Sequence, residues 1–226
     1  MKKTKKILAA MLVVLLLTTL APVTFADDAE TVREMWQAHA TITEINDNFV
    51  LIKTNTGEEI LLNTNDATVF LDNKTRELKS LSDLKAGDSI VAYYSPVMTR
   101  SFPPQTVCYA IITNIGDLSQ ANLVRVSEIT KTDDGIKFLT ADGDYIITVS
   151  IDTPVTAIDS EAVLTAADIK EGDLLFAWFG IVALSYPGQT NADAILIVDT
   201  SEDVSVNDPI YSAVMAMLKR FIRLFT

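Results

Sequence analysis

The hydrophobic positions of this chain fall in short runs that are separated by polar turns. Valine, isoleucine and aromatic residues dominate the runs, and the turns include "NDN", "NTGE" and "AGD". Runs of this length, rich in β-branched and aromatic residues and bounded by Asn, Asp and Gly, are typical of β-strands. In the first half of the chain they predict strands at Phe49–Lys53, Glu59–Leu62, Ser89–Tyr94 and Val107–Ile112.

The pattern occurs twice. The segment "ATITEINDNFVLIKTNTGEEILLN", from Ala40, matches "LVRVSEITKTDDGIKFLTADGDYIITV", from Leu123. Further on, "SDLKAGDSIVAYY" matches "ADIKEGDLLFAWF", and "PPQTVCYAII" matches "PGQTNADAIL", at offsets between 84 and 86 residues. Two copies are too few for a solenoid. We therefore predict two tandem small domains, residues 40–113 and 123–198, joined by a linker at 114–122.

One helical signal recurs in each copy. Ser80 and Thr165 each precede an aspartate by three residues, which is the spacing of a capping box at a helix N-terminus. We expect Gly87 and Gly172 to end one or two helical turns. Five or six strands with one such turn predict a small closed barrel, because closure removes exposed strand edges. The predicted fold class is all-β, with two tandem OB-like or SH3-like barrels and a C-terminal amphipathic α-helix.

The first 26 residues have the pattern of a secretory signal peptide. Four lysines precede an apolar run from Ile7 to Leu20, and "APVTFA" supplies small residues ahead of a cleavage site after Ala26. The run is short for a membrane-spanning helix of ~20 residues, so we expect cleavage and a lead-in at residues 27–39. The sequence thus predicts a secreted or extracellular protein that is associated with the cell envelope.

The composition limits the classes of partner. The net charge of the whole chain is −12, and removal of the four signal lysines leaves −16. Nucleic-acid affinity comes mostly from Lys and Arg that neutralise phosphates, so we expect no nucleic-acid partner. The single cysteine, Cys108, excludes an internal disulfide. Stability must therefore come from the apolar residues, which make up 49% of the chain.

Residues 209–226 follow a polar bridge at 199–208 and differ from the rest in charge. The segment has three basic residues and no acidic one, and its large apolar residues recur at helical spacing. This pattern leaves two alternatives: a helix that packs across the barrels, or a basic amphipathic helix on an anionic membrane or in a partner's groove. In the second alternative the contact residues are Met217, Leu218, Lys219, Arg220, Phe221, Arg223 and Phe225.

The stretch "LSDLKAGDSIVAYYSPVMTRSFPPQT", with its counterpart in the second copy, resembles repeats in secreted proteins of Gram-positive anaerobes. Some of these repeats accompany the small domain named after the N-terminus of copper amine oxidases. The resemblance implies a cell-surface setting and no chemistry, and nothing in the chain resembles the catalytic part of an amine oxidase.

Few residues indicate chemistry. A copper or zinc site normally needs several His or Cys ligands, and this chain has one of each, His39 and Cys108. Asp142 and Asp144 are weak calcium candidates, because their turn lacks the spacing of a twelve-residue calcium loop and such residues are also ordinary in turns. We expect no cofactor. A hydrolase normally needs a deep cleft, for which two small barrels leave little chain.

The segment "YYSPVMTRSFPPQT" (93–106) joins the last two predicted strands of the first copy. Its counterpart, "FGIVALSYPGQT" (179–190), shares an aromatic–proline step. A shared step at one topological place favours barrel closure or packing between the copies. If the first copy alone binds a ligand, the candidate contacts are Arg100, Tyr93, Tyr94 and Phe102.

These observations together predict an exported, non-catalytic binding or assembly module that acts at the cell envelope. The expected partners are an envelope protein, a polymer or an anionic membrane surface. The alternative is an envelope hydrolase or an accessory domain of one.

Overall fold

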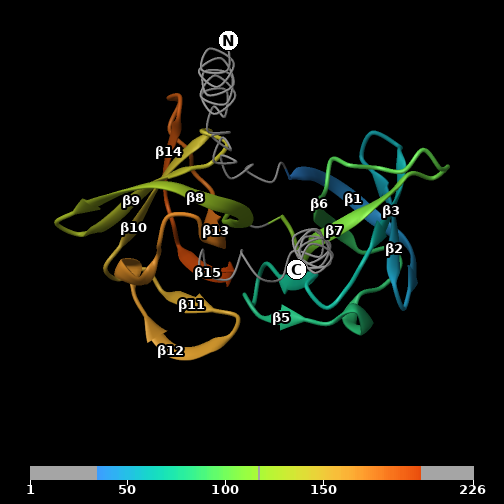
Figure 1. Cartoon of the computed structure of the whole chain (residues 1–226), viewed down its shortest axis with the longest axis horizontal. Coiled ribbons are helices and arrows are strands. Elements are labelled where there is room, and N and C mark those ends of the chain that lie inside the picture. Colours follow the sequence, from blue (N-terminus) through green and yellow to red (C-terminus); the bar gives the residue numbers. More distant parts are fainter. Residues whose placement is uncertain (1–34, 117, 200–226) are drawn as a thin grey trace, which may run out of the picture. The chain divides into compact units, whose positions relative to one another are not determined.

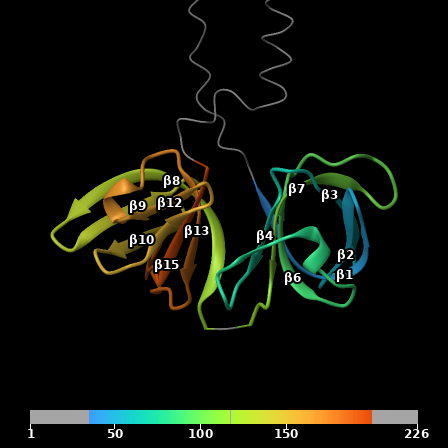
Figure 2. The same cartoon turned by 90° about the horizontal axis from the view of Figure 1, so that it is seen from below.

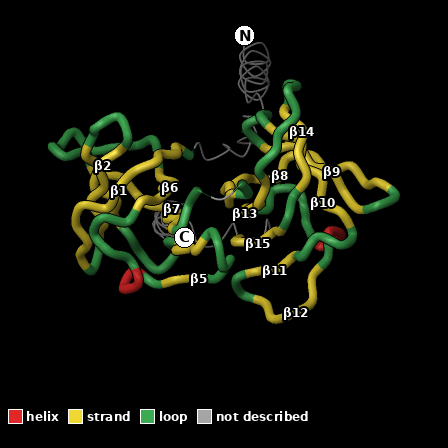
Figure 3. The backbone as a smooth tube through the Cα atoms, turned by 180° about the vertical axis from the view of Figure 1, so that it is seen from behind, coloured by secondary structure: helices red, strands yellow, loops and turns green. Residues whose placement is uncertain are grey.

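The computed structural model describes residues 35–116 and 118–199. The predicted signal peptide and the C-terminal amphipathic segment lie outside the described residues. Strands dominate the described part of the chain, and its helices are two short 3₁₀ turns (Figure 3). Neither is long and apolar enough to span a bilayer. The prediction of an all-β chain that contains a closed barrel is confirmed.

In the first half, five strands form a closed ring (Figure 2). The elements are β1 (Trp36–Asn46), β2 (Phe49–Thr54), β3 (Glu59–Asn63), β4 (Val69–Asp72), β5 (Leu78–Lys79), η1 (Leu81–Asp83), β6 (Ser89–Tyr94) and β7 (Gln105–Thr113). Antiparallel pairs join β3 to β2, β2 to β1, β1 to β6 and β6 to β7. A parallel pair between β3 and β7 closes the ring. Strand β4 continues the sheet beyond β7, and β5 forms its edge.

The second half contains eight strands (Figure 1). They and one 3₁₀ turn are β8 (Gln120–Thr132), β9 (Gly135–Thr140), β10 (Tyr145–Ser150), β11 (Val155–Ala157), β12 (Ser160–Leu164), η2 (Ala166–Asp168), β13 (Leu174–Phe179), β14 (Gly188–Asn191) and β15 (Ala194–Asp199). The sheet order is β12-β11-β15-β13-β8-β9-β10-β14. The order of pairings matches that of the first half when β14 and β15 together take the place of β7. Between them, Ala192 N–H donates to Thr148 and Asp193 N–H donates to Trp178, at 2.9 and 2.7 Å.

Each half encloses its own apolar core. Along β2 the buried positions alternate with more exposed ones, so that Val50 and Ile52 point inward. Alternation arises because successive side chains of a strand point to opposite faces. The same rule places Phe138 and Ile147 in the core of the second half.

A third apolar cluster joins the two halves. It contains Leu71, Val91 and Tyr93 from the first half and Phe176 and Trp178 from the second. This cluster explains why "SIVAYY" of β6 and "LLFAWF" of β13 are nearly continuous apolar runs. One face of each strand lines its own core and the other face lines the shared cluster, so both faces are buried.

The hairpin between β4 and β5 binds the two halves by hydrogen bonds. The side chain of Asn73 accepts from Ala121 N–H at 2.8 Å and donates to the Ser119 carbonyl at 3.3 Å. The indole N–H of Trp178 donates to the Asn73 carbonyl at 3.1 Å, and the Arg76 guanidinium lies 5.7 Å from the centre of the same ring. The sequence pattern did not predict this contact.

Asp72 holds the same hairpin in place. Its carboxylate accepts from Lys79 Nζ at 2.9 Å, from Asn114 Nδ2 at 2.6 Å, and from the N–H groups of Lys74 and Thr75. Burial opposes ionisation, but the hydrogen bonds from these four donors outweigh it and lower the pKa of Asp72 to about 2. The carboxylate is therefore ionised at neutral pH.

Each predicted helical segment is a single 3₁₀ turn of three residues. Asp83 caps η1 by accepting from the N–H and hydroxyl of Ser80 at 2.8 and 2.7 Å, and Asp168 caps η2 in the same way. The backbone becomes extended immediately afterwards, at Leu84 and Ile169, because these side chains enter the barrel cores. The prediction that glycines end these helices is wrong. Gly87 and Gly172 instead take positive φ in the following turn.

Candidate functional site: two exposed apolar loops

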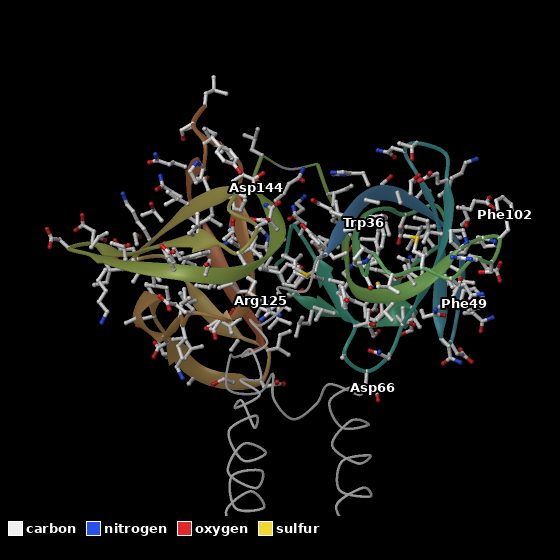
Figure 4. All side chains as sticks on the ribbon, turned by 45° about the horizontal axis from the view of Figure 1, so that its top comes forward. Trp36, Phe49, Asp66, Phe102, Arg125 and Asp144 are labelled. Atoms are coloured by element: carbon white, nitrogen blue, oxygen red, sulfur yellow. The ribbon has the colours of Figure 1, made fainter. Side chains whose placement is uncertain are left out.

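Two loops at equivalent places carry large apolar side chains into solvent. The first apolar loop, residues 95–104, connects β6 to β7, and the second apolar loop, residues 180–187, connects β13 to β14. Phe102 is 97% exposed, and Figure 4 shows it at the tip of its loop, pointing away from the barrel. Tyr186, 84 residues later, is 83% exposed, and Leu184 is fully exposed.

The exposed apolar side chains are concentrated at these loops. Of the eleven large ones in residues 35–116 and 118–199, seven lie in or beside the two loops: Trp36, Val97, Phe102, Leu118, Ile181, Leu184 and Tyr186. Trp36 lies opposite Tyr94, where the first loop begins. Leu118 contacts the start of the second loop so closely that a β-carbon added at Gly180 would overlap its carbonyl oxygen. Single exposed apolar residues are ordinary, but a concentration of them indicates a binding surface.

Both loops are held by the same three hydrogen bonds. In the first loop they run from Thr99 N to Gln105 O at 2.9 Å, from Ser101 Oγ to Pro103 O at 2.8 Å, and from Thr106 Oγ1 to Val97 O at 3.0 Å. In the second loop they run from Ala183 N to Gln189 O at 2.8 Å, from Ser185 Oγ to Pro187 O at 2.8 Å, and from Thr190 Oγ1 to Ile181 O at 2.8 Å. Every donor and acceptor has its counterpart 84 residues away.

A partly buried side chain anchors each loop to the core of its half. Met98 packs against the first core and Val182 against the second. The neighbouring side chains of Val97 and Ile181 point outward and are exposed. The loops therefore have fixed conformations in which some apolar residues stabilise the fold and others are left for contact.

Barrel closure uses only the residues that follow the prolines. Both aromatic–proline peptide bonds, Phe102-Pro103 and Tyr186-Pro187, are cis. In the first half, Gln105–Val107 pair with Leu61–Asn63, and in the second half Gly188–Asn191 pair with Tyr145–Thr148. The aromatic residues before the prolines make no such contact and stay exposed. The segment thus combines an architectural part with an exposed part.

The loops also differ from the rest of the chain in charge. Arg100 is the only charged residue between Ser89 and Gly116, and none occurs between Leu174 and Ala192. Acidic residues lie at the base of the second loop, where Gly188 N–H donates to the Asp144 carbonyl at 2.8 Å. An apolar, nearly uncharged surface is thus presented by a protein whose net charge is −12.

The four candidate ligand contacts differ in their exposure to solvent. Arg100 and Phe102 are exposed, whereas Tyr93 and Tyr94 are buried. Burial raises the pKa of Tyr93 to about 12, and burial together with nearby Glu58 raises the pKa of Tyr94. Both tyrosine side chains therefore pack within the apolar clusters of the fold. The exposed apolar residues of the second loop were not among the predicted contacts, although their 84-residue spacing from the first loop was visible in the sequence.

The remaining candidate residues lie on separate elements of the fold. His39 lies on β1 with its side chain exposed, and Cys108 is buried, which raises the pKa of its thiol. Asp142 accepts from the Thr140 hydroxyl and from Asp144 N–H, so its carboxylate stabilises the turn. Within the described residues, no three His, Cys, Asp or Glu side chains are grouped as a metal site. The candidate contacts of the C-terminal segment lie outside the described residues.

No protein family and no curated protein matches the chain. Among solved structures, the chain is similar to a multidomain protein with nucleic acid binding domains from Streptococcus pneumoniae TIGR4. The identity is 18% and the TM-score is 0.18. The match covers 76% of this chain and 47% of the other, so this chain spans about half the length of that protein.

This comparison contradicts two predictions from the sequence. The similar protein is described by its nucleic acid binding domains, which conflicts with an envelope module and with the exclusion of nucleic acid as a partner. Both predictions depended on net charge and on the signal-like N-terminus, and neither property specifies a binding surface. They are not carried further. At a TM-score of 0.18 the likeness carries no argument for the function of this chain.

Proposed function

We propose that this chain is a protein-binding module whose two apolar loops insert into apolar clefts of a partner protein. The observation that carries the proposal is the pair Phe102 and Tyr186, which are almost fully exposed at equivalent positions of loops with the same hydrogen bonds. Leaving large apolar side chains in water is unfavourable, and burying one such side chain contributes about 1.5–3 kcal/mol. A bound partner would gain this free energy at each loop.

The place of the loops in the fold supports a binding role. We infer that the two halves are repeats of one OB-type domain, a five-stranded Greek-key barrel. The ring order β1-β2-β3-β7-β6 and the parallel pairing of its third and fifth strands support this inference. In OB-type barrels the loop between the fourth and fifth strands is one of the loops that contact bound oligonucleotides and oligosaccharides. In this chain that position corresponds to the two apolar loops.

The chemistry of the loops favours a protein over other ligands. The two loops together contain one charged residue, Arg100. Val97, Ile181 and Leu184 are aliphatic and offer neither hydrogen bonds nor charge. Exposed aromatic side chains such as Phe102 and Tyr186 fit the apolar centre of a protein interface, where buried aromatic anchors carry most of the binding energy. Because the chain is acidic, we expect the partner's cleft to have a basic rim.

We also propose that the protein is exported after removal of residues 1–26. The lysines, the apolar run and the small residues before Ala26 support this proposal. The N-terminal sequence of the protein recovered from the culture medium tests it. The expected first residue is Asp27, and recovery of the protein only inside cells, with Met1 retained, would contradict it.

Capture by matched variants tests the binding function. The chain without residues 1–26 is immobilised as wild type, as the double variant Phe102→Asp/Tyr186→Asp, and as Val163→Asp. Val163 is an equally exposed apolar residue remote in sequence from both loops, so it is the control for a charge on the surface. The probes are the proteins of the source organism, neutral phosphatidylcholine vesicles and a single-stranded oligonucleotide.

The proposal expects one protein that wild type and the control retain and the double variant loses. When that protein is purified, its affinity should fall by roughly thirtyfold for each aromatic residue removed, which corresponds to about 2 kcal/mol. Equal retention by all three chains would contradict the proposal. Binding of vesicles or of the oligonucleotide that the double variant loses would also overturn it.

A further inference from the structure

We propose that residues 209–226 of this chain bind to its own second apolar loop and cover Ile181, Leu184 and Tyr186. This inference rests on the proposed function in one respect: the C-terminal segment would compete with the partner protein for one of the two binding loops. It concerns the second loop alone, because the two loops differ in charge although they share their backbone hydrogen bonds.

The C-terminal segment has the composition that the second loop requires. It has large apolar residues at helical spacing, among them Met217, Leu218 and Phe221. It also carries three cations, Lys219, Arg220 and Arg223, and no acidic residue. An apolar loop on an acidic protein should bind a ligand whose apolar surface is surrounded by basic residues.

Arg100 distinguishes the two loops, because exposed acidic residues lie at the base of both: Glu58 and Glu59 in the turn before Leu61 for the first loop, and three aspartates for the second. Asp142 and Asp144 are exposed in the turn at the base of the second loop, and Asp193 is exposed next to Trp178, two residues before Gly180. Figure 4 labels Asp144, which lies on the second half of the molecule. These carboxylates attract the three cations of the segment. In the first loop Arg100 occupies the position equivalent to Leu184 and repels them.

The chain is long enough to make this contact within one molecule. β15 ends at Asp199, which lies opposite Leu174 at the start of β13, and the second loop begins just after Phe179 at the other end of β13. Five residue steps along a strand span about 17 Å. The nine residues 200–208 reach about 30 Å when extended. The connection therefore spans the required distance with length to spare.

An environment-sensitive dye on a single cysteine tests this contact in the chain without residues 1–26. Cys108 is buried with a raised pKa, so a dye labels an added exposed cysteine selectively. The reporter is Ala183→Cys, which leaves the three apolar side chains of the second loop in place. The matched control is Thr99→Cys, the equivalent position of the first loop. The perturbing variant is Phe221→Asp, which keeps the chain length and introduces an acidic residue into the segment.

The proposal expects blue-shifted emission from the dye at position 183 and not from the dye at position 99. Phe221→Asp should shift the emission of the dye at position 183 to the red, and added salt should cause a smaller red shift. A synthetic peptide of residues 209–226, added to the Phe221→Asp chain, should restore the blue-shifted emission. The signal should not depend on protein concentration. Emission at 183 that matches emission at 99 and ignores Phe221→Asp would overturn the proposal. A response at position 99 alone would reject the choice of loop, and a concentration-dependent signal would show that the contact is between molecules.

This outcome can be separated from that of the proposed function. If the segment does not bind but the loops still retain a partner protein, the inference fails and the proposed function stands. If the segment binds and no partner is retained, the second loop is a site for the chain itself. If the proposed function and this inference are both correct, Phe221→Asp should increase the affinity of the second loop for the partner protein several-fold.

Discussion

Replacement of Asp72 by asparagine should destabilise the protein in a way that depends on pH. The carboxylate is only 5% exposed, and its pKa is lowered from 3.8 to about 2. Because the folded pKa lies below the unfolded value, ionisation of Asp72 stabilises the folded state above pH ~4, and this stabilisation is lost as the pH falls toward 2. A difference of roughly two pKa units, at about 1.4 kcal/mol per unit, gives about 2.5 kcal/mol at neutral pH.

The asparagine in Asp72→Asn keeps one oxygen for the N–H groups of Lys74 and Thr75. It removes the negative charge and turns an amide N–H₂ toward the donors of Lys79 and Asn114. We therefore expect a loss of about 2–4 kcal/mol at pH 7, since loss of a charge-assisted, buried network costs more than an exposed pair. The loss should shrink as the pH approaches 2, where the wild-type carboxylate also becomes protonated.

Guanidinium denaturation, followed by the fluorescence of Trp178, measures this effect. Trp178 is buried against the same hairpin, and a Trp36→Phe background removes the signal of the other tryptophan. The exposed Asp66→Asn is the control and should change the free energy of unfolding by less than about 0.5 kcal/mol. The reasoning is refuted if Asp72→Asn costs as little as the control at pH 7, or if its cost is the same at pH 7 and pH 2.5.

Three further predictions use the same denaturation assay. Tyr94→Ala should cost roughly 3–5 kcal/mol because the ring is buried, whereas exposed Arg100→Ala should stay within about 0.5 kcal/mol; a large loss from Arg100→Ala would reveal a buried polar role. Thr190→Val should cost about 1–2 kcal/mol, since it removes the hydroxyl that holds the second loop, and an unchanged stability would show that the loop is held otherwise. Gly180→Ala should destabilise the protein and displace the second loop, because its β-carbon would overlap the Leu118 carbonyl, and a neutral effect would contradict that close approach.

The strands could be predicted because each half of the chain buries one face of most of them. Ser89–Tyr94 has the predicted bounds, and Phe49–Lys53 and Glu59–Leu62 are each extended by one residue. The first strand begins at Trp36, earlier than the predicted domain start at Ala40, because its first residues pair with β6 while their side chains remain largely exposed. Pairing without burial leaves no hydrophobic pattern to detect.

The contact between the two halves could not be predicted from the pattern. Asn73 belongs to a stretch that looks like an ordinary turn, and its role depends on Ala121 and Trp178, which are distant in the sequence. The exposure of the apolar loops was equally hidden. Phe102 and Tyr94 are both aromatic residues of one segment, and only the fold shows that one is exposed and the other is buried.

The most direct test of the central claim is photo-cross-linking from the tip of the first loop. A photoreactive phenylalanine analogue replaces Phe102 in one chain and Val163 in another, and both are irradiated with the partner protein identified by capture. The account predicts a covalent product from position 102 that is at least about tenfold more abundant than the product from position 163. The partner peptide attached to it should line an apolar cleft. Excess wild-type chain should suppress the product, and excess Phe102→Asp/Tyr186→Asp should not. Equal products from both positions, or a product that the double variant suppresses as well as wild type does, would contradict it.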